Sequence, residues 1–98
     1  MKQHLISIID SLSNISFQNN LIYNIDDIEL LKKILTEFVT KINNQGKLDK
    51  TDLINYETAN DIIYNLNLDN NQTLFTDAIS NEFYAFGYEF QELLKNII

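Results

Sequence analysis

The chain contains no cysteine, no arginine, a single histidine and only two glycines. Without cysteine there is neither a disulfide nor thiol chemistry, so the fold must rest on its hydrophobic core. One histidine without cysteine excludes a conventional zinc site and the usual nucleophile–base pair. The two glycines, Gly46 and Gly87, leave no glycine-rich loop that would cradle a phosphate. We therefore expect no enzymatic activity, no metal and no cofactor.

Long hydrophobic runs are also missing. No apolar stretch approaches the roughly 18 to 20 residues of a membrane span. The first residues are too polar, and their apolar stretch too short, for a secretory signal. The hydrophobic content of 45% and the charged content of 21% are ordinary for a globular protein. We expect one soluble, intracellular domain that covers residues 1–98.

The net charge of −7 is unevenly distributed. Residues 1–46 carry four lysines and five carboxylates, whereas residues 47–98 carry three lysines and nine carboxylates. A nucleic-acid-binding protein needs basic residues for the phosphates and arginine for the bases. We therefore expect no nucleic acid among its partners. An acidic surface suits a basic protein partner, or serves solubility alone.

Four segments repeat apolar residues at spacings of three and four, which is typical of amphipathic helices. The longest covers residues 68–98, and its apolar stripe consists of Phe75, Ile79, Phe83, Phe86, Phe90, Leu93 and Ile97. The three shorter segments present Leu5, Ile8, Ile9, Leu12 and Ile15, then Ile28, Leu31, Leu35, Phe38 and Ile42, then Tyr56, Ala59, Ile62, Ile63 and Leu66. Further apolar residues that we expect to face the core are Phe17, Ile22, Leu30, Ile34 and Val39.

Polar residues mark where these helices begin and end. The predicted capping groups are Asp26 with Glu29, Asp49 with a hydrophobic staple of Leu48 and Leu53, and Asp69 with Gln72. Gly46 is suited to end the second helix, because it adopts the left-handed conformation without strain. Short connections force successive helices to run antiparallel. The sequence predicts an all-α fold, an antiparallel four-helix bundle with a long C-terminal helix.

The outer face of the last helix carries two tyrosines. Tyr84 and Tyr88 lie four residues apart, opposite the phenylalanine stripe, and share their face with Asp77, Asn81 and Lys95. Amphipathic rings among polar neighbours favour a protein interface, although contact with another helix of the bundle is the alternative. Gly87 lies between them and indicates a close approach of another backbone, a kink or an earlier helix end.

Two further expectations concern the ends of the chain. His4 is expected to be solvated at a frayed terminus. The last turns of the long helix are expected to protrude and expose Leu93, Leu94, Ile97 and Ile98, and such an apolar patch usually marks a partner or a membrane surface.

The run from Tyr56 to Leu68 into Asp69, followed by a long last helix, resembles the immunity proteins of pediocin-like (class IIa) bacteriocins, of the enterocin A immunity type. The positions that match that family's pattern are Ala59, Leu66, Leu68, Leu74, Phe75 and Ile79. The resemblance covers roughly residues 50–86.

The resemblance implies a non-enzymatic, cytoplasmic protein that protects the bacteriocin producer. It would act, as a monomer near the membrane, on the sugar phosphotransferase permease to which the bacteriocin is bound. In that family specificity is associated with the C-terminal half. Here this implies a partner-binding set of Tyr84, Tyr88, Glu89, Glu92 and Lys95.

Two other classes remain open at this point. One is an acidic phage- or plasmid-encoded inhibitor, of anti-CRISPR or anti-restriction type, that binds a basic protein through salt-sensitive contacts. The other is an oligomerising helical module that pairs through an apolar stripe.

Overall fold

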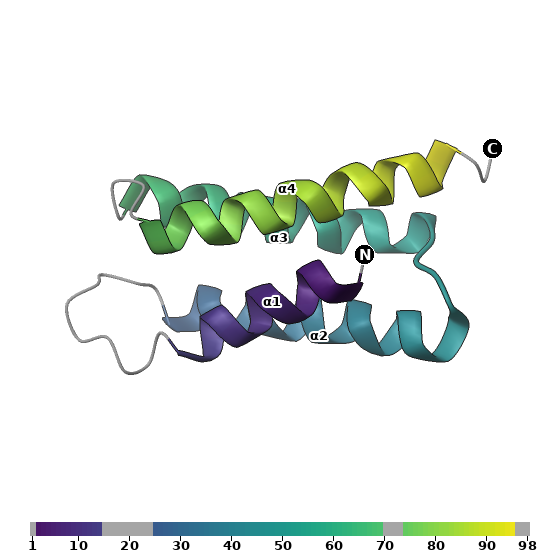
Figure 1. Cartoon of the computed structure of the whole chain (residues 1–98), viewed down its shortest axis with the longest axis horizontal. Helices are drawn as coiled ribbons and strands as arrows, with labels where there is room; N and C mark the ends of the chain where they lie inside the picture. The colour runs from purple at the N-terminus through teal and green to yellow at the C-terminus, as the bar shows by residue number, and fades with distance from the viewer. Residues whose placement is uncertain (1, 15–24, 70–73, 96–98) are drawn as a thin grey trace.

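The computed structural model describes residues 2–14, 25–69 and 74–95, and within these ranges every regular element is helical. The helices are α1 (Lys2–Ser13), α2 (Ile25–Gln45), the short 3₁₀ turn η2 (Lys50–Asp52), α3 (Leu53–Asp69) and α4 (Leu74–Lys95). Successive helices run in opposite directions (Figure 1). Helices α1 and α2 form one layer of the bundle, and α3 and α4 form the other. The predicted all-α, antiparallel four-helix bundle is confirmed.

The four helices share one core. Each helix packs against two others: α1 and α3 both contact α2 and α4. The buried apolar residues are Leu5, Ile8, Leu12, Ile28, Leu31, Ile34, Leu35, Phe38, Leu48, Ala59, Ile62, Ile63, Leu66, Ile79, Phe83, Phe86 and Phe90. All of them except Leu48, which was predicted as a staple residue, were predicted from spacing. Leu30 was also expected to face the core, but it lies exposed on α2.

The phenylalanines of α4 are among the largest side chains in this core. Phe83, Phe86 and Phe90 are almost completely buried, and the rings of Phe86 and Phe38 stack at 5.8 Å between centroids. This contact joins the α1–α2 layer to the α3–α4 layer. Burial of such rings removes large apolar areas from water, which is the dominant favourable term in folding.

Two of the predicted helix starts are wrong. Helix α2 already begins at Ile25, so Asp26 lies within its first turn rather than before it. Asp69 is the last residue of α3, and α4 begins only at Leu74. Helix α2 therefore begins two residues earlier than a cap at Asp26 predicts. Asp26 and Asp27 still lie in its first turn, where carboxylates interact favourably with the helix dipole.

The predicted cap at Asp49 is confirmed, with one change. The Asp49 carboxylate accepts a hydrogen bond from the Thr51 amide at 2.9 Å, and the Asp49 amide donates to Asp52 at 2.8 Å. The residue that completes this capping box is therefore Asp52. Of the expected staple, Leu48 is fully buried, whereas Leu53 is exposed.

The end of α2 follows the prediction. Gly46 has a φ of 81°, and its amide donates to the Ile42 carbonyl at 2.8 Å. This is the single 5→1 hydrogen bond of an αL C-cap. Any residue with a Cβ would be strained in this conformation.

The C-terminal helix begins later than predicted, at Leu74 rather than near residue 68. Leu93 and Leu94 were expected to be exposed at its end, but they are half-buried and pack against the core. The predicted positions of Ile15, Phe17, Ile22, Ile97 and Ile98, and the side chain of Phe75, lie outside the described residues.

His4 is not a solvated residue at a frayed end, as had been expected. It is half-buried in α1, and its Nδ1 lies 2.7 Å from Glu82 Oε2 on α4. Sequence spacing carries no information about this contact, because the two residues are 78 positions apart. The pair ties the shortest helix to α4.

We predict that Phe83→Ala lowers the free energy of unfolding by about 3 to 5 kcal/mol, because it leaves a cavity among buried rings. Urea unfolding followed by far-UV circular dichroism measures this loss. Tyr84→Ala, one residue further on the exposed face of the same helix, is the matched control and should change stability by about 0.5 kcal/mol or less. Similar losses in both variants would contradict the assignment of the two faces.

Candidate functional site

Three tyrosines project from the α3–α4 layer into solvent. Tyr64 on α3 is 63% exposed, and Tyr84 and Tyr88 on α4 are 79% and 64% exposed. We call these three residues the tyrosine face. Large exposed side chains gathered in one place usually mark an interaction site, and tyrosine is enriched in the residues that dominate binding energy.

Two adjacent depressions lie beside the tyrosine face, along the line where α3 packs on α4. The first has a volume of about 190 Å³ and is lined by Tyr56, Asn60, Ile63, Tyr64, Ser80, Phe83 and Tyr84. The second, of about 200 Å³, is lined by Tyr56, Tyr84, Gly87, Tyr88 and Gln91. Tyr56 and Tyr84 line both, so the depressions form one shallow groove between the two helices.

Tyr56 forms the floor of this groove. Its ring stacks on Phe83 at 5.2 Å between centroids and 15° between planes, and it lies 5.3 Å from the ring of Phe90. Burial raises the pKa of the Tyr56 phenol, while a hydrogen bond with the Gln91 side chain acts in the opposite direction. The phenol therefore stays protonated at neutral pH and serves as a hydrogen-bonding group.

Gly87 makes room for Tyr56. A Cβ built on Gly87 would overlap the Tyr56 hydroxyl oxygen and lie 3.2 Å from its Cζ atom. Helix α4 continues through this residue, so an earlier helix end does not explain the glycine. The predicted close approach is observed, although the approaching group is the side chain of Tyr56 and not a backbone.

The structure divides the predicted partner-binding set. Tyr84 and Tyr88 border the groove, and Lys95 lies two turns after Tyr88 on the same side, with its Nζ 3.4 Å from Glu92 Oε1. Glu89 instead follows Tyr88 by about 100° around the helix and lies within electrostatic range of His4 on α1. Glu89 thus belongs to the α1 side of α4 and is separated from the tyrosines.

Four groove residues were missed by sequence reasoning. These are Asn60 and Tyr64 on α3, and Ser80 and Gln91 on α4. Asn60 and Tyr64 are four residues apart, one turn along a helix, and this spacing was a usable signal. Their alignment with Tyr84 depends on how α3 packs on α4.

The two layers differ strongly in charge. Helices α3 and α4 contain seven carboxylates and one lysine, a net charge of −6. Helices α1 and α2 contain five carboxylates and four lysines, a net charge of −1. The asymmetry between the two halves of the sequence therefore becomes an asymmetry between two layers, and the groove lies in the acidic one.

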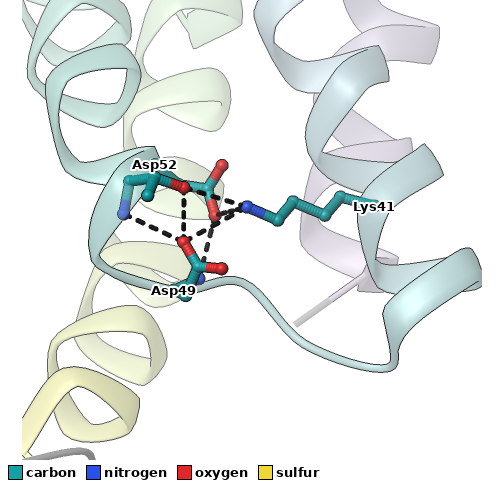
Figure 2. A network of polar contacts seen from close by, with 4 residues as sticks. Lys41, Asp49 and Asp52 are labelled. Carbon is teal, nitrogen blue, oxygen red and sulfur yellow. Dashed lines mark hydrogen bonds and ion pairs between the residues drawn. The ribbon is translucent and has the colours of Figure 1, made fainter.

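A polar cluster at the start of α3 also combines charged groups. Figure 2 shows the Lys41 ammonium group of α2 reaching Asp52 at 2.9 Å and Asp49 at 3.2 Å. Asp52 is only 7% exposed, and it is the one charged side chain that is buried among the described residues. Both carboxylates also serve the capping box described above. The cluster therefore joins the end of α2 to the start of α3 and is structural.

Hydrogen bonds in this cluster favour the charged forms of Lys41 and Asp49. Hydrogen bonding to Asp52 raises the pKa of Lys41, although desolvation opposes the shift. Hydrogen bonds from Thr51 and Lys41 lower the pKa of Asp49.

In the described part of the chain, no group of three histidine, aspartate or glutamate side chains is placed to hold a metal ion. Across the same residues, no helix is both long and apolar enough to cross a membrane.

Comparison of the chain with protein-family models, with curated proteins and with solved structures finds no match.

We predict that Lys41→Met destabilises the fold by an amount that depends on pH. The folded-state pKa of Asp49 lies below 3.8 and that of Lys41 above 10.5, so the wild-type pair contributes fully between these values. The contribution of the pair decreases when the pH is lowered through the pKa of Asp49. It also decreases when the pH is raised through the pKa of Lys41. Urea unfolding of both proteins at a series of pH values measures the difference. A difference that stays constant at both extremes would contradict the ion pair.

We also predict that Gly87→Ala destabilises the fold by about 1 kcal/mol, although alanine is favoured over glycine in a helix by about the same amount. The reason is the overlap of the new methyl group with Tyr56. Tyr56→Phe removes the overlapping oxygen, so the double variant should lose less than the sum of the single variants.

The matched control is Ala78→Gly at an exposed position of α4, which measures the helix propensity alone. A gain in stability for Gly87→Ala, equal to the loss for Ala78→Gly, would mean that Tyr56 does not lie over Gly87.

Proposed function

We propose that this chain is an immunity protein of the pediocin-like bacteriocin type. In this proposal it is a non-enzymatic cytoplasmic protein that acts on the bacteriocin-bound sugar phosphotransferase permease. It binds that partner through the tyrosine face. The observation that carries the proposal is the gathering of Tyr64, Tyr84 and Tyr88 around one groove of the acidic layer.

The exposure of the groove supports a protein partner over a small ligand. Its bordering tyrosines Tyr64, Tyr84 and Tyr88 stay 63% to 79% exposed, whereas sites for small molecules are concave and bury most of the ligand surface. Shallow depressions between exposed tyrosines instead suit individual side chains of a protein surface. Tyrosine binds such surfaces at low entropic cost, because its rigid ring has few rotatable bonds.

The nature of the partner is supported by the resemblance of residues 50–86 to the immunity family. That resemblance points to the C-terminal half, and the groove is built entirely from α3 and α4. Sequence pattern and surface geometry therefore favour the same part of the chain.

The proposal predicts that expression of this chain in a bacterium sensitive to pediocin-like bacteriocins raises the dose of one or a few of these peptides needed to inhibit growth. Tyr88→Ala should reduce this protection at least about tenfold, as expected for a residue that dominates an interface. The measurement is a growth-inhibition titration with a panel of the peptides.

The matched control is Leu30→Ala, which shortens an exposed apolar side chain on the opposite layer. Equal expression and equal thermal melts of the variants separate loss of binding from loss of fold. Absence of protection across the panel would contradict the immunity function. Full protection by Tyr88→Ala would contradict the tyrosine face as its binding surface.

A further inference from the structure

We propose that the groove of the tyrosine face binds a cationic amphipathic helix of its protein partner, laid along the line between α3 and α4. The inference rests on the proposed function in one respect only, since it takes the tyrosine face as the partner surface. It adds the chemical nature of the segment that the surface recognises.

The shape of the groove favours a helix. The two depressions follow one another along the contact of two antiparallel helices and share Tyr56 and Tyr84. A helix presents apolar side chains in a row at spacings of three and four residues, and these enter successive depressions of a groove. The partner helix would thereby become a fifth helix against the α3–α4 layer.

The charges around the groove favour a cationic segment. Four exposed carboxylates share the side of the tyrosine face: Glu57 and Asp61 on α3, and Asp77 and Glu92 on α4. Each is separated from a tyrosine of the face by three, four or seven residues and so lies one or two turns away on the same side. Lys95 is the one lysine of α3 and α4, which leaves these five residues with a net charge of −3.

The exposed rings add a second attraction for cations. The face of a tyrosine ring carries the negative part of its quadrupole and attracts lysine and arginine within about 6 Å. Tyr84 and Tyr88 keep most of their surface open to solvent. The aromatic rings and the carboxylates along the groove therefore both favour a positively charged partner. The depressions favour a partner helix that also presents apolar side chains.

The same charge disfavours other occupants. A second copy of this chain would bring two α3–α4 layers together, each with a net charge of −6. Anionic lipid and nucleic acid would meet the same repulsion. A partner helix rich in lysine or arginine instead gains from every carboxylate that it approaches.

The test uses two designed peptides of about five helical turns. Both present the same leucine face with one tryptophan, and one has lysine along the flanks where the other has glutamate. Because the protein contains no tryptophan, the fluorescence of the peptide reports binding directly. We expect saturable binding of the lysine peptide, at least about tenfold tighter than that of the glutamate peptide and weaker as salt is raised.

Variants of the full chain locate the site. Tyr84→Ala should weaken binding of the lysine peptide at least about tenfold, whereas Leu30→Ala on α2 should leave it unchanged. Asp61→Asn combined with Glu57→Gln should weaken it several-fold, whereas Glu37→Gln, an exposed carboxylate of α2, should not. Thermal melts confirm that each variant is folded.

Equal affinity for the two peptides, no saturable binding of the lysine peptide, or equal effects of the α2 and α3–α4 variants would each overturn the inference. Protection of cells with dependence on Tyr88 but without lysine-peptide binding would overturn the inference and leave the proposed function intact. Binding of the lysine peptide at the groove without protection would support the inference and contradict the immunity function.

Discussion

The packing of Tyr56 into α4 is the contact on which the candidate surface depends. Its ring stacks on Phe83 and contacts Phe90, and its hydroxyl group lies where a side chain at position 87 would be. This one side chain therefore belongs to the core and to the groove at the same time. A bulkier residue at Gly87 would push the ring away, fill one depression and disturb the phenylalanine stack.

The position of Tyr56 is in turn set by the start of α3. Tyr56 follows Asp52 by four residues, which is about one helical turn. Asp52 is held by Lys41 from α2 and by the Asp49 amide, while Leu48 is buried in the core just before the helix begins. The charged cluster at the start of α3 thus fixes the helix that carries Tyr56 and Tyr64. Buried ionic groups are expensive to desolvate, and their use here for helix placement is consistent with a role in specifying one arrangement.

The bundle also sorts charge and aromatic surface onto the same layer. An acidic layer with three exposed tyrosines differs from an evenly charged surface that serves solubility alone. In the proposed complex, the electrostatic field of this layer would act at longer range than the tyrosines and would speed the encounter with a cationic partner. The rings and depressions would then determine the affinity once the two surfaces meet. The carboxylates and the tyrosines of this layer lie on helices rather than loops, which favours a preformed binding surface.

The sequence by itself determined the four helices, most of the core, the Asp49 cap, the Gly46 turn and the place of Tyr84 and Tyr88 opposite the phenylalanine stripe. These features depend on residues within one or two turns of each other, so spacing and propensity suffice. Cap residues were less certain, because neighbouring polar residues compete, and the predicted starts at Asp26 and Asp69 were displaced. Only the tertiary structure brought Tyr64 and Tyr56 to Tyr84 and placed His4 against Glu82. Those placements depend on how helices from distant parts of the chain pack, and local periodicity does not encode the rotation of one helix against another.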